Sequence, residues 1–148
     1  MPTIDLEPIG YVENPHFELG AASGEKRNDA GWKMIDANVV LKDQYTDGLD
    51  DIEQYKHLVI VFWPHKRNLD ARYARVKIHP QGREDLPLTG IFSTCSPARP
   101  NSTLVTVVKF VKRDGNVLTV KGLDALDGSP VIDIKPYYPA YHATADAE

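Results

Sequence analysis

Residues 57–63 limit the possible folds more than any other part of the chain, because they read His-Leu-Val-Ile-Val-Phe-Trp. The run is far shorter than the roughly 20 residues that a membrane-spanning helix needs. Its β-branched residues favour a strand over a helix. Almost continuous apolar character is typical of a strand that is covered on both faces. We therefore expect a buried core strand here.

Other strand-like segments follow, separated by proline and glycine. They are residues 9–12, 32–41, 73–79, 90–94, 104–111, 117–121 and 131–134. Asp114-Gly115 predicts a hairpin turn between two of them, whereas the acid-rich residues 46–55 predict one or two helical turns. Residues 15–31 and 81–88 are expected to be long loops, and the tail after Tyr138 to be frayed. This pattern predicts an all-β sandwich or barrel.

Length and composition are those of one globular domain. The chain has 148 residues, of which 42% are hydrophobic and 26% charged, so we expect a single domain over residues 1–148 with no second C-terminal domain. Residues 1–7 contain two acids and no basic, apolar leader, which argues against a signal peptide. Cys95 is the single cysteine, which excludes an internal disulfide. We expect a cytoplasmic protein that does not engage a membrane.

The charge is negative overall but uneven. A formal net charge of −4 argues against unspecific binding to polyanions such as DNA. Residues 65–83 nevertheless form a basic stripe with one acid, Asp70. Its members are Lys66, Arg67, Arg72, Arg75, Lys77 and Arg83. Such a stripe fits contact with an RNA backbone or an anionic substrate, and it equally fits a solvated strand edge.

Two polar clusters follow apolar segments. His65 and Lys66 come directly after the core strand, where a buried strand delivers polar groups to a cleft; an ordinary surface strand end is the alternative. Arg99 and Asn101 lie in residues 92–101, where Pro97 and Pro100 restrict the backbone. That loop either holds the two side chains in place or is a rigid connection without chemistry.

A third cluster occupies residues 123–137. Asp127-Gly128 is a turn signature. Asp124 and Asp133 stand between apolar neighbours, where an acid requires a partner or a function. Asp124 is therefore a candidate site residue.

Several other kinds of site lack their sequence pattern. The chain has no glycine-rich phosphate loop, no dinucleotide fingerprint and no Gly-x-Ser-x-Gly elbow. His57, His65 and His79 do not have a recognised ligand spacing, and no cysteine pair is present. We expect no metal site.

Taken in order, these clusters resemble the TrmO family, also called the TsaA-like or YaeB-like domain. The most specific segment is residues 123–137, which read Leu-Asp-x-x-Asp-Gly-x-Pro-Val-x-Asp-Ile-Lys-Pro-Tyr; the similarity extends over residues 9–12, 48–58, 62–66, 90–94 and 96–101. The resemblance implies an all-β, closed or nearly closed barrel with short helical turns. It also implies a homodimer that binds S-adenosylmethionine near the dimer contact. The implied activity is methylation of N6 of threonylcarbamoylated adenosine beside the tRNA anticodon.

The resemblance also implies the cofactor contacts, residue by residue. They are His65, Lys66, Cys95, Arg99, Asn101, Val105, Leu123, Asp124, Ala125 and Leu126. Arg99 suits the methionine carboxylate through a two-pronged hydrogen bond, and the backbone of residues 123–126 suits the adenine edge. Asp124 and His65 are the candidate catalytic groups, although alignment alone supplies much of an in-line methyl transfer. Cys95 departs from the family, which commonly has arginine there.

The acceptor stays open between tRNA and a small molecule. Two further hypotheses are a non-catalytic module that binds S-adenosylmethionine or a nucleotide, and an RNA-binding barrel without catalysis. The first predicts cofactor affinity without release of S-adenosylhomocysteine. The second predicts salt-dependent RNA affinity without cofactor binding.

Overall fold

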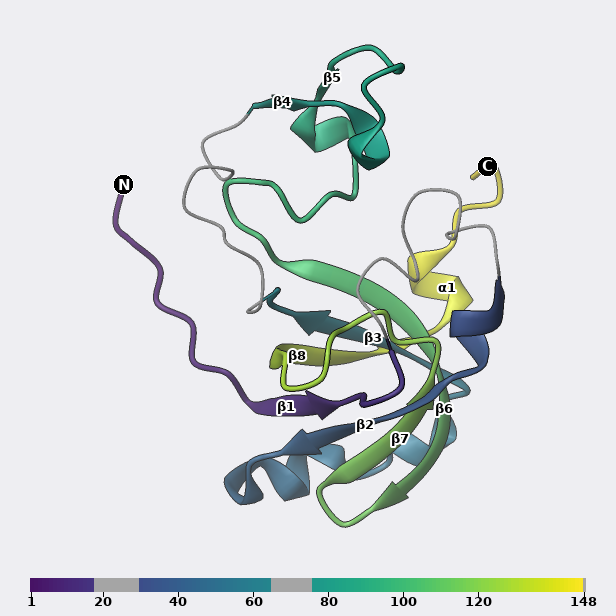
Figure 1. Ribbon diagram of the computed structural model, residues 1–148. Coiled ribbons are helices and arrows are strands. Elements are labelled where there is room, and N and C mark those ends of the chain that lie inside the picture. The colour runs from purple at the N-terminus through teal and green to yellow at the C-terminus, as the bar shows by residue number, and fades with distance from the viewer. Residues whose placement is uncertain (18–29, 65–75, 148) are drawn as a thin grey trace.

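The computed structural model of the protein describes residues 1–17, 30–64 and 76–147 (Figure 1). Its main body is a closed barrel in which every neighbouring pair of strands is antiparallel. Around the barrel the strands are β1 (Gly10–Glu13), β2 (Asp36–Leu41), β7 (Val117–Lys121), β6 (Leu104–Asp114), β3 (His57–Phe62) and β8 (Pro130–Tyr137). The prediction of an all-β, closed barrel with short helical turns is confirmed.

The barrel interior is filled by alternate residues of its strands. Val12 lies opposite Val39, and Val39 lies opposite Leu118, so one layer of side chains crosses three strands. All three are fully buried. Each large apolar side chain removed from water in this way contributes about 1.5–3 kcal/mol. The period-two alternation of the sequence is what places these residues on one face.

The core strand β3 is covered more fully inside than outside. Leu58, Ile60 and Phe62 face the barrel interior and are at most 2% exposed. Val59 and Val61 face outward, and there Val59 is buried whereas Val61 is half-buried. The expectation of cover on both faces therefore holds for Val59 and only partly for Val61.

Gly10 allows β1 to approach β2 closely. A Cβ atom at this position would lie 2.2 Å from the carbonyl oxygen of Val40. Glycine is needed here because of the backbone contact, and not because of an unusual backbone angle. This close contact is part of the closure of the barrel between β1 and β2.

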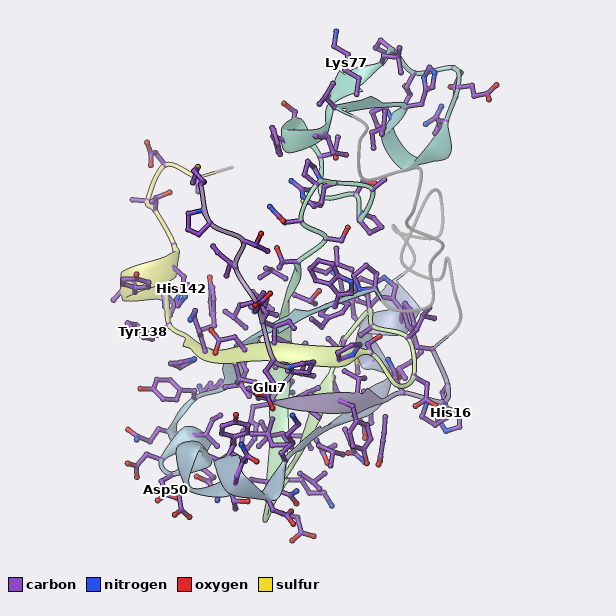
Figure 2. All side chains as sticks on the ribbon, turned by 90° about the vertical axis from the view of Figure 1, so that its left-hand side faces the viewer. Glu7, His16, Asp50, Lys77, Tyr138 and His142 are labelled. Carbon is purple, nitrogen blue, oxygen red and sulfur yellow. The ribbon has the colours of Figure 1, made fainter. Side chains whose placement is uncertain are left out.

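A second, two-stranded sheet projects beyond the end of the barrel at which β6 begins (Figure 1). It consists of β4 (Lys77–Ile78) and β5 (Thr89–Gly90), with the 3-10 helices η5 (Pro80–Gly82) and η6 (Ile91–Ser93). Figure 2 shows Lys77 at the far end of this projection. The expected strand over residues 90–94 is wrong, because Ile91–Ser93 turn into η6. Of the expected strand over residues 73–79, positions 73–75 lie outside the described residues, and only Lys77–Ile78 pair.

The helical segments are short, as the sequence predicted. Residues 43–55 form η3 (Asp43–Leu49) and η4 (Ile52–Gln54), joined by Asp51 in a left-handed conformation with φ of 68°. The start of the expected strand over residues 32–41 belongs instead to η2 (Ala30–Met34). The tail was expected to fray after Tyr138, yet α1 (Pro139–His142) follows it. Within the described part of the chain, no helix is long and apolar enough to span a bilayer.

Candidate active site

The first residues of β6 connect the two segments that the sequence singled out, one around Arg99 and one around Asp124. Arg99 lies in the loop that runs directly into Leu104, the first residue of β6. Two residues further on, Thr106 donates a hydrogen bond of 2.5 Å from Oγ1 to Oδ1 of Asp124. The connection between β7 and β8 and the loop before β6 therefore lie at the same end of the barrel.

Asp124 is half-buried between two buried apolar neighbours, Leu123 and Ala125. Its carboxylate accepts a hydrogen bond from the Thr106 hydroxyl. This contact explains how an acid is accommodated in an apolar segment. Only one carboxylate oxygen is used by this bond. The second oxygen has no hydrogen-bond partner within the described part of the chain.

Asn14 fixes the backbone on which Asp124 lies, and sequence reasoning missed it. The fully buried side chain donates from Nδ2 to the carbonyl oxygens of Leu123 at 3.0 Å and Ala125 at 2.9 Å. Its own N–H donates to Oδ1 of Asp127 at 2.8 Å. The available signal was the period-two pattern, which places position 14 on the same inward face as Val12.

The turn that follows is closed by Ser129. Its Oγ donates to the carbonyl oxygen of Leu126 at 2.6 Å, and the N–H of Gly128 donates to the carbonyl oxygen of Val12 at 2.7 Å. Gly128 has a φ of 82°, as the Asp-Gly turn signature predicted. The carbonyl oxygens of Leu123, Ala125 and Leu126 thus each accept a hydrogen bond from within the protein.

The loop over residues 94–103 is held by its own polar groups. Nη1 of Arg99 donates to the carbonyl oxygens of Thr94 at 2.8 Å and Ser96 at 3.1 Å. Ser102 is fully buried, and its Oγ donates to the carbonyl oxygens of Pro97 and Arg99. The loop is therefore rigid in the way that its two prolines suggested, and Ser102 is a second residue that sequence reasoning missed.

Arg99 and Asp124 share an end of the barrel without touching. No hydrogen bond or ion pair joins them within the described ranges. Val105 lies on β6 between Leu104, where the Arg99 loop ends, and Thr106, which binds Asp124. It is 62% exposed on the outer face, opposite Val61 of β3. Cys95 and Asn101 are exposed in the Arg99 loop. A ligand that touched both segments would fill the space between them.

His65 and Lys66 lie outside the described residues. The strand that precedes them ends at Phe62, which pairs with Leu104 at the start of β6. Asp133, the other acid that the sequence flagged, is on the outer face of β8. It accepts from Nζ of Lys135 at 2.5 Å and is not part of this site.

Two buried polar atoms near this end have no partner within the described part of the chain. They are the acceptor Oδ1 of Asn14 and the donor Nε1 of Trp32. Trp32 belongs to η2, which packs against Gly122, where an added Cβ would lie 3.3 Å from the carbonyl oxygen of Lys33. Buried polar groups are normally paired, so these two atoms fit a place where a polar ligand completes the hydrogen bonds.

The chain matches a family model described as the tRNA-methyltransferase O N-terminal domain over residues 21–143. An Archaeoglobus fulgidus S-adenosyl-L-methionine-binding protein is 38% identical over 135 residues, which are 90% of this chain and 89% of that protein. The human tRNA (adenine(37)-N6)-methyltransferase is 32% identical over 139 residues, which are 91% of this chain and 30% of that enzyme.

Solved structures show the same likeness. The crystal structure of TrmO from Pseudomonas aeruginosa superposes with a TM-score of 0.76 at 28% identity, and the match covers 99% of this chain and 62% of that one. The chain thus spans less than two thirds of that protein, and 30–38% of the length of some curated relatives.

Proposed function

The chain belongs to the family of the tRNA-methyltransferase O N-terminal domain, and we propose from this membership that it is an S-adenosylmethionine-dependent methyltransferase. The observation that carries the proposal is that the Arg99 loop runs into the start of β6, where Thr106 binds Asp124. Each carries one charged side chain and is fixed by hydrogen bonds to its backbone. The name of the A. fulgidus relative supports S-adenosylmethionine as the cofactor, and the name of the human relative supports methyl transfer as the reaction.

The residues present fit this cofactor. Nη1 of Arg99 is used within its loop, which leaves Nε and Nη2 to bind the methionine carboxylate as a pair. The free oxygen of Asp124 suits the positive sulfonium or a ribose hydroxyl. The orphaned atoms of Asn14 and Trp32 and the backbone N–H groups of residues 124–126 suit the polar edge of adenine. His65 and Lys66 remain proposed contacts.

When bound, the cofactor supplies an activated methyl group for an in-line displacement. The protein must hold the acceptor nitrogen on the line of the breaking bond, and a rigid loop and a rigid turn are what such alignment requires. Asp124 is the proposed group for accepting the proton that the acceptor nitrogen loses, and His65 is the alternative.

For the acceptor we propose N6 of an adenosine in tRNA, in its threonylcarbamoylated form. The supporting observation is the relatives named as adenine-37 N6 methyltransferases of tRNA. Such an acceptor would place the protein in the cytoplasm. A small-molecule acceptor is the second candidate, favoured by the net charge of −4 and by Cys95 in place of the arginine common in the family.

We further propose that the protein is a homodimer. Val105 and Val107 are 62% and 46% exposed on the outer face of β6. Together with Val61 and Val59 on β3 they form an outward apolar patch beside the site. A contact between two copies across this patch would remove the valines from water and bring Val105 toward the cofactor.

Calorimetric titration with S-adenosylmethionine tests the cofactor. We expect binding to the wild type, loss of affinity in Arg99→Ala, and no change in Lys42→Ala, which removes an exposed ion pair with Glu7 elsewhere on the barrel. Absence of binding at millimolar cofactor would overturn the proposal. Equal binding by Arg99→Ala would overturn only the role of Arg99.

Release of S-adenosylhomocysteine on incubation with hypomodified tRNA tests the reaction. Turnover supports the methyltransferase and the tRNA acceptor together. Cofactor binding without turnover on tRNA or on small nitrogen nucleophiles would favour a non-catalytic binding module.

A further inference from the structure

A continuous chain of aromatic rings covers one side of the barrel, away from the Arg99 loop. Figure 2 shows two of its members, Tyr138 and His142, beside the end of β8. We call this surface the aromatic platform. It consists of Tyr55, His57, Tyr137, Tyr138, Tyr141 and His142.

The platform is built by the docking of α1 onto β8 and β3. His142 stacks on Tyr137, with centroids 5.0 Å apart and planes at 29°. Tyr138 stacks on Tyr55 at 6.2 Å, also at 29°. Tyr141 contacts the ring of His142 at 4.9 Å. These contacts explain why a short helix forms where the sequence predicted a frayed tail.

Two rings of the platform are substantially exposed to solvent. Tyr141 is 76% exposed and Tyr138 is 41% exposed. Tyrosines that only served to hold α1 would be covered by their neighbours. An exposed and fixed ring face is instead what a nucleobase needs for stacking.

Two exposed lysines lie next to His57 of the platform, one along the chain and one across the sheet. The strand register places Lys109 of β6 and Tyr137 of β8 on either side of His57. Lys56 and Lys109 are exposed, and neither forms an ion pair within the described ranges. Lys135 is paired with Asp133, whose hydrogen bond and charge raise the pKa of the lysine, with a smaller contribution from Tyr141. The exposed side chains of Lys56 and Lys109 suit contact with phosphates.

The platform lies on the outer face of the barrel, further along β6 from the Arg99 loop than Val105 does. Lys109 is four residues along β6 from Val105, which corresponds to about 13 Å at the rise of a strand. Going along β6 from Lys109, the next set of outward residues across the three strands is Val107, Val59 and Lys135. The set after that is Val105, Val61 and Asp133. A nucleic acid that filled the site with one base could therefore reach the platform with its neighbours.

We propose that the aromatic platform is the docking surface for a single-stranded RNA loop, whose unstacked bases lie on Tyr141 and Tyr138 while Lys109 and Lys56 contact the backbone. The inference rests on the proposed function and adds the place where its RNA acceptor binds. Sequence-selective proteins recognise RNA mainly at such splayed loops, by stacking on aromatic rings.

Fluorescence anisotropy with two unmodified RNAs tests the proposal, one a stem-loop with adenosine in its single-stranded loop and the other a blunt duplex. We expect the full-length protein to prefer the stem-loop. Tyr141→Ala should weaken that binding at least about fivefold, in line with the loss of one stacked base, whereas Tyr141→Phe should restore it. Lys109→Ala should lower the slope of log affinity against log salt concentration by about one.

The matched control is Tyr11→Ala. Tyr11 is 46% exposed on β1, so this substitution removes a tyrosine side chain from another part of the barrel. Wild-type affinity in Tyr141→Ala, or an equal loss in Tyr11→Ala, would overturn the platform. Dissociation of a dimer by Tyr141→Ala, measured by sedimentation, would assign the surface to a protein contact instead.

The outcomes separate this inference from the function on which it rests. S-adenosylmethionine titrations on the same variants should be unchanged. If RNA binds and is methylated while the platform variants behave as wild type, the inference fails and the proposed function stands. If S-adenosylmethionine binds but neither the stem-loop nor the duplex RNA does, the proposed tRNA acceptor and the proposed role of the platform are both contradicted.

Discussion

Thr106 holds the carboxylate of Asp124 at one end of the barrel by a hydrogen bond of 2.5 Å between Oγ1 and Oδ1. The bond connects β6 to the segment that follows β7. Hydrogen bonds to a charged acceptor are stronger than neutral ones. The bond also fixes which oxygen of Asp124 remains free, and so links a structural contact to the proposed chemistry.

Thr106→Val should separate the hydroxyl from the shape of the side chain. We expect a loss of unfolding free energy of about 1.5–3 kcal/mol, since the carboxylate loses its partner, together with weaker S-adenosylmethionine binding. Urea denaturation and calorimetry measure the two effects. Thr106→Ser keeps the hydroxyl and should retain the binding. Unchanged cofactor affinity in Thr106→Val would remove Asp124 from the site.

Asn14→Ala should be among the more damaging polar substitutions. It leaves the buried carbonyl oxygens of Leu123 and Ala125 without donors, and each unsatisfied group costs about 1–3 kcal/mol. We expect a loss of about 2–4 kcal/mol in urea denaturation. Asn101→Ala, at an exposed loop position, should change stability by no more than about 0.5 kcal/mol. Similar values for the two variants would show that Asn14 does not hold the segment.

The strands were predictable where a local pattern decides the structure. Val117–Lys121 alternates cleanly and follows an Asp-Gly turn, so β7 has the bounds that the sequence predicted. Residues 90–94 have strand composition, yet Ile91 is fully buried in the projecting sheet and begins η6. Local composition cannot distinguish these cases, because the short pairing of β5 with β4 ends at Gly90, and the N–H of Ile91 donates to the carbonyl oxygen of Val76.

The candidate site residues that stand out in the sequence are those that break a pattern. Arg99 between two prolines and Asp124 between apolar residues both stood out. Asn14 did not, because its partners are separated from it by 109 and 111 positions along the chain. The aromatic platform was missed for the same reason, since Tyr55 and Tyr138 become neighbours only when α1 docks.

Gly10→Ala should prevent the normal approach of β1 to β2. The added Cβ would lie 2.2 Å from the carbonyl oxygen of Val40, and a backbone atom cannot move aside without shifting the strand. We expect a loss of at least about 1–3 kcal/mol, as in overpacked cores, measured as a lower melting temperature. At Gly48 an added Cβ meets nothing within 4 Å, so Gly48→Ala is the control and should leave the melting temperature nearly unchanged.

Arg113→Ala should loosen the segment of η3 and η4. The Arg113 side chain is 16% exposed and donates to the carbonyl oxygens of Leu49 at 3.1 Å and Thr46 at 3.3 Å. It also lies 3.5 Å from Asp50, but that acid is exposed, so the ion pair adds little. We expect a loss of about 1–3 kcal/mol from the carbonyl bonds and faster amide hydrogen exchange in residues 43–54. Arg113→Lys keeps the charge but lacks the planar fork, and should recover only part of the stability. Full recovery by lysine would show that the charge, and not the paired carbonyl contacts, holds the segment.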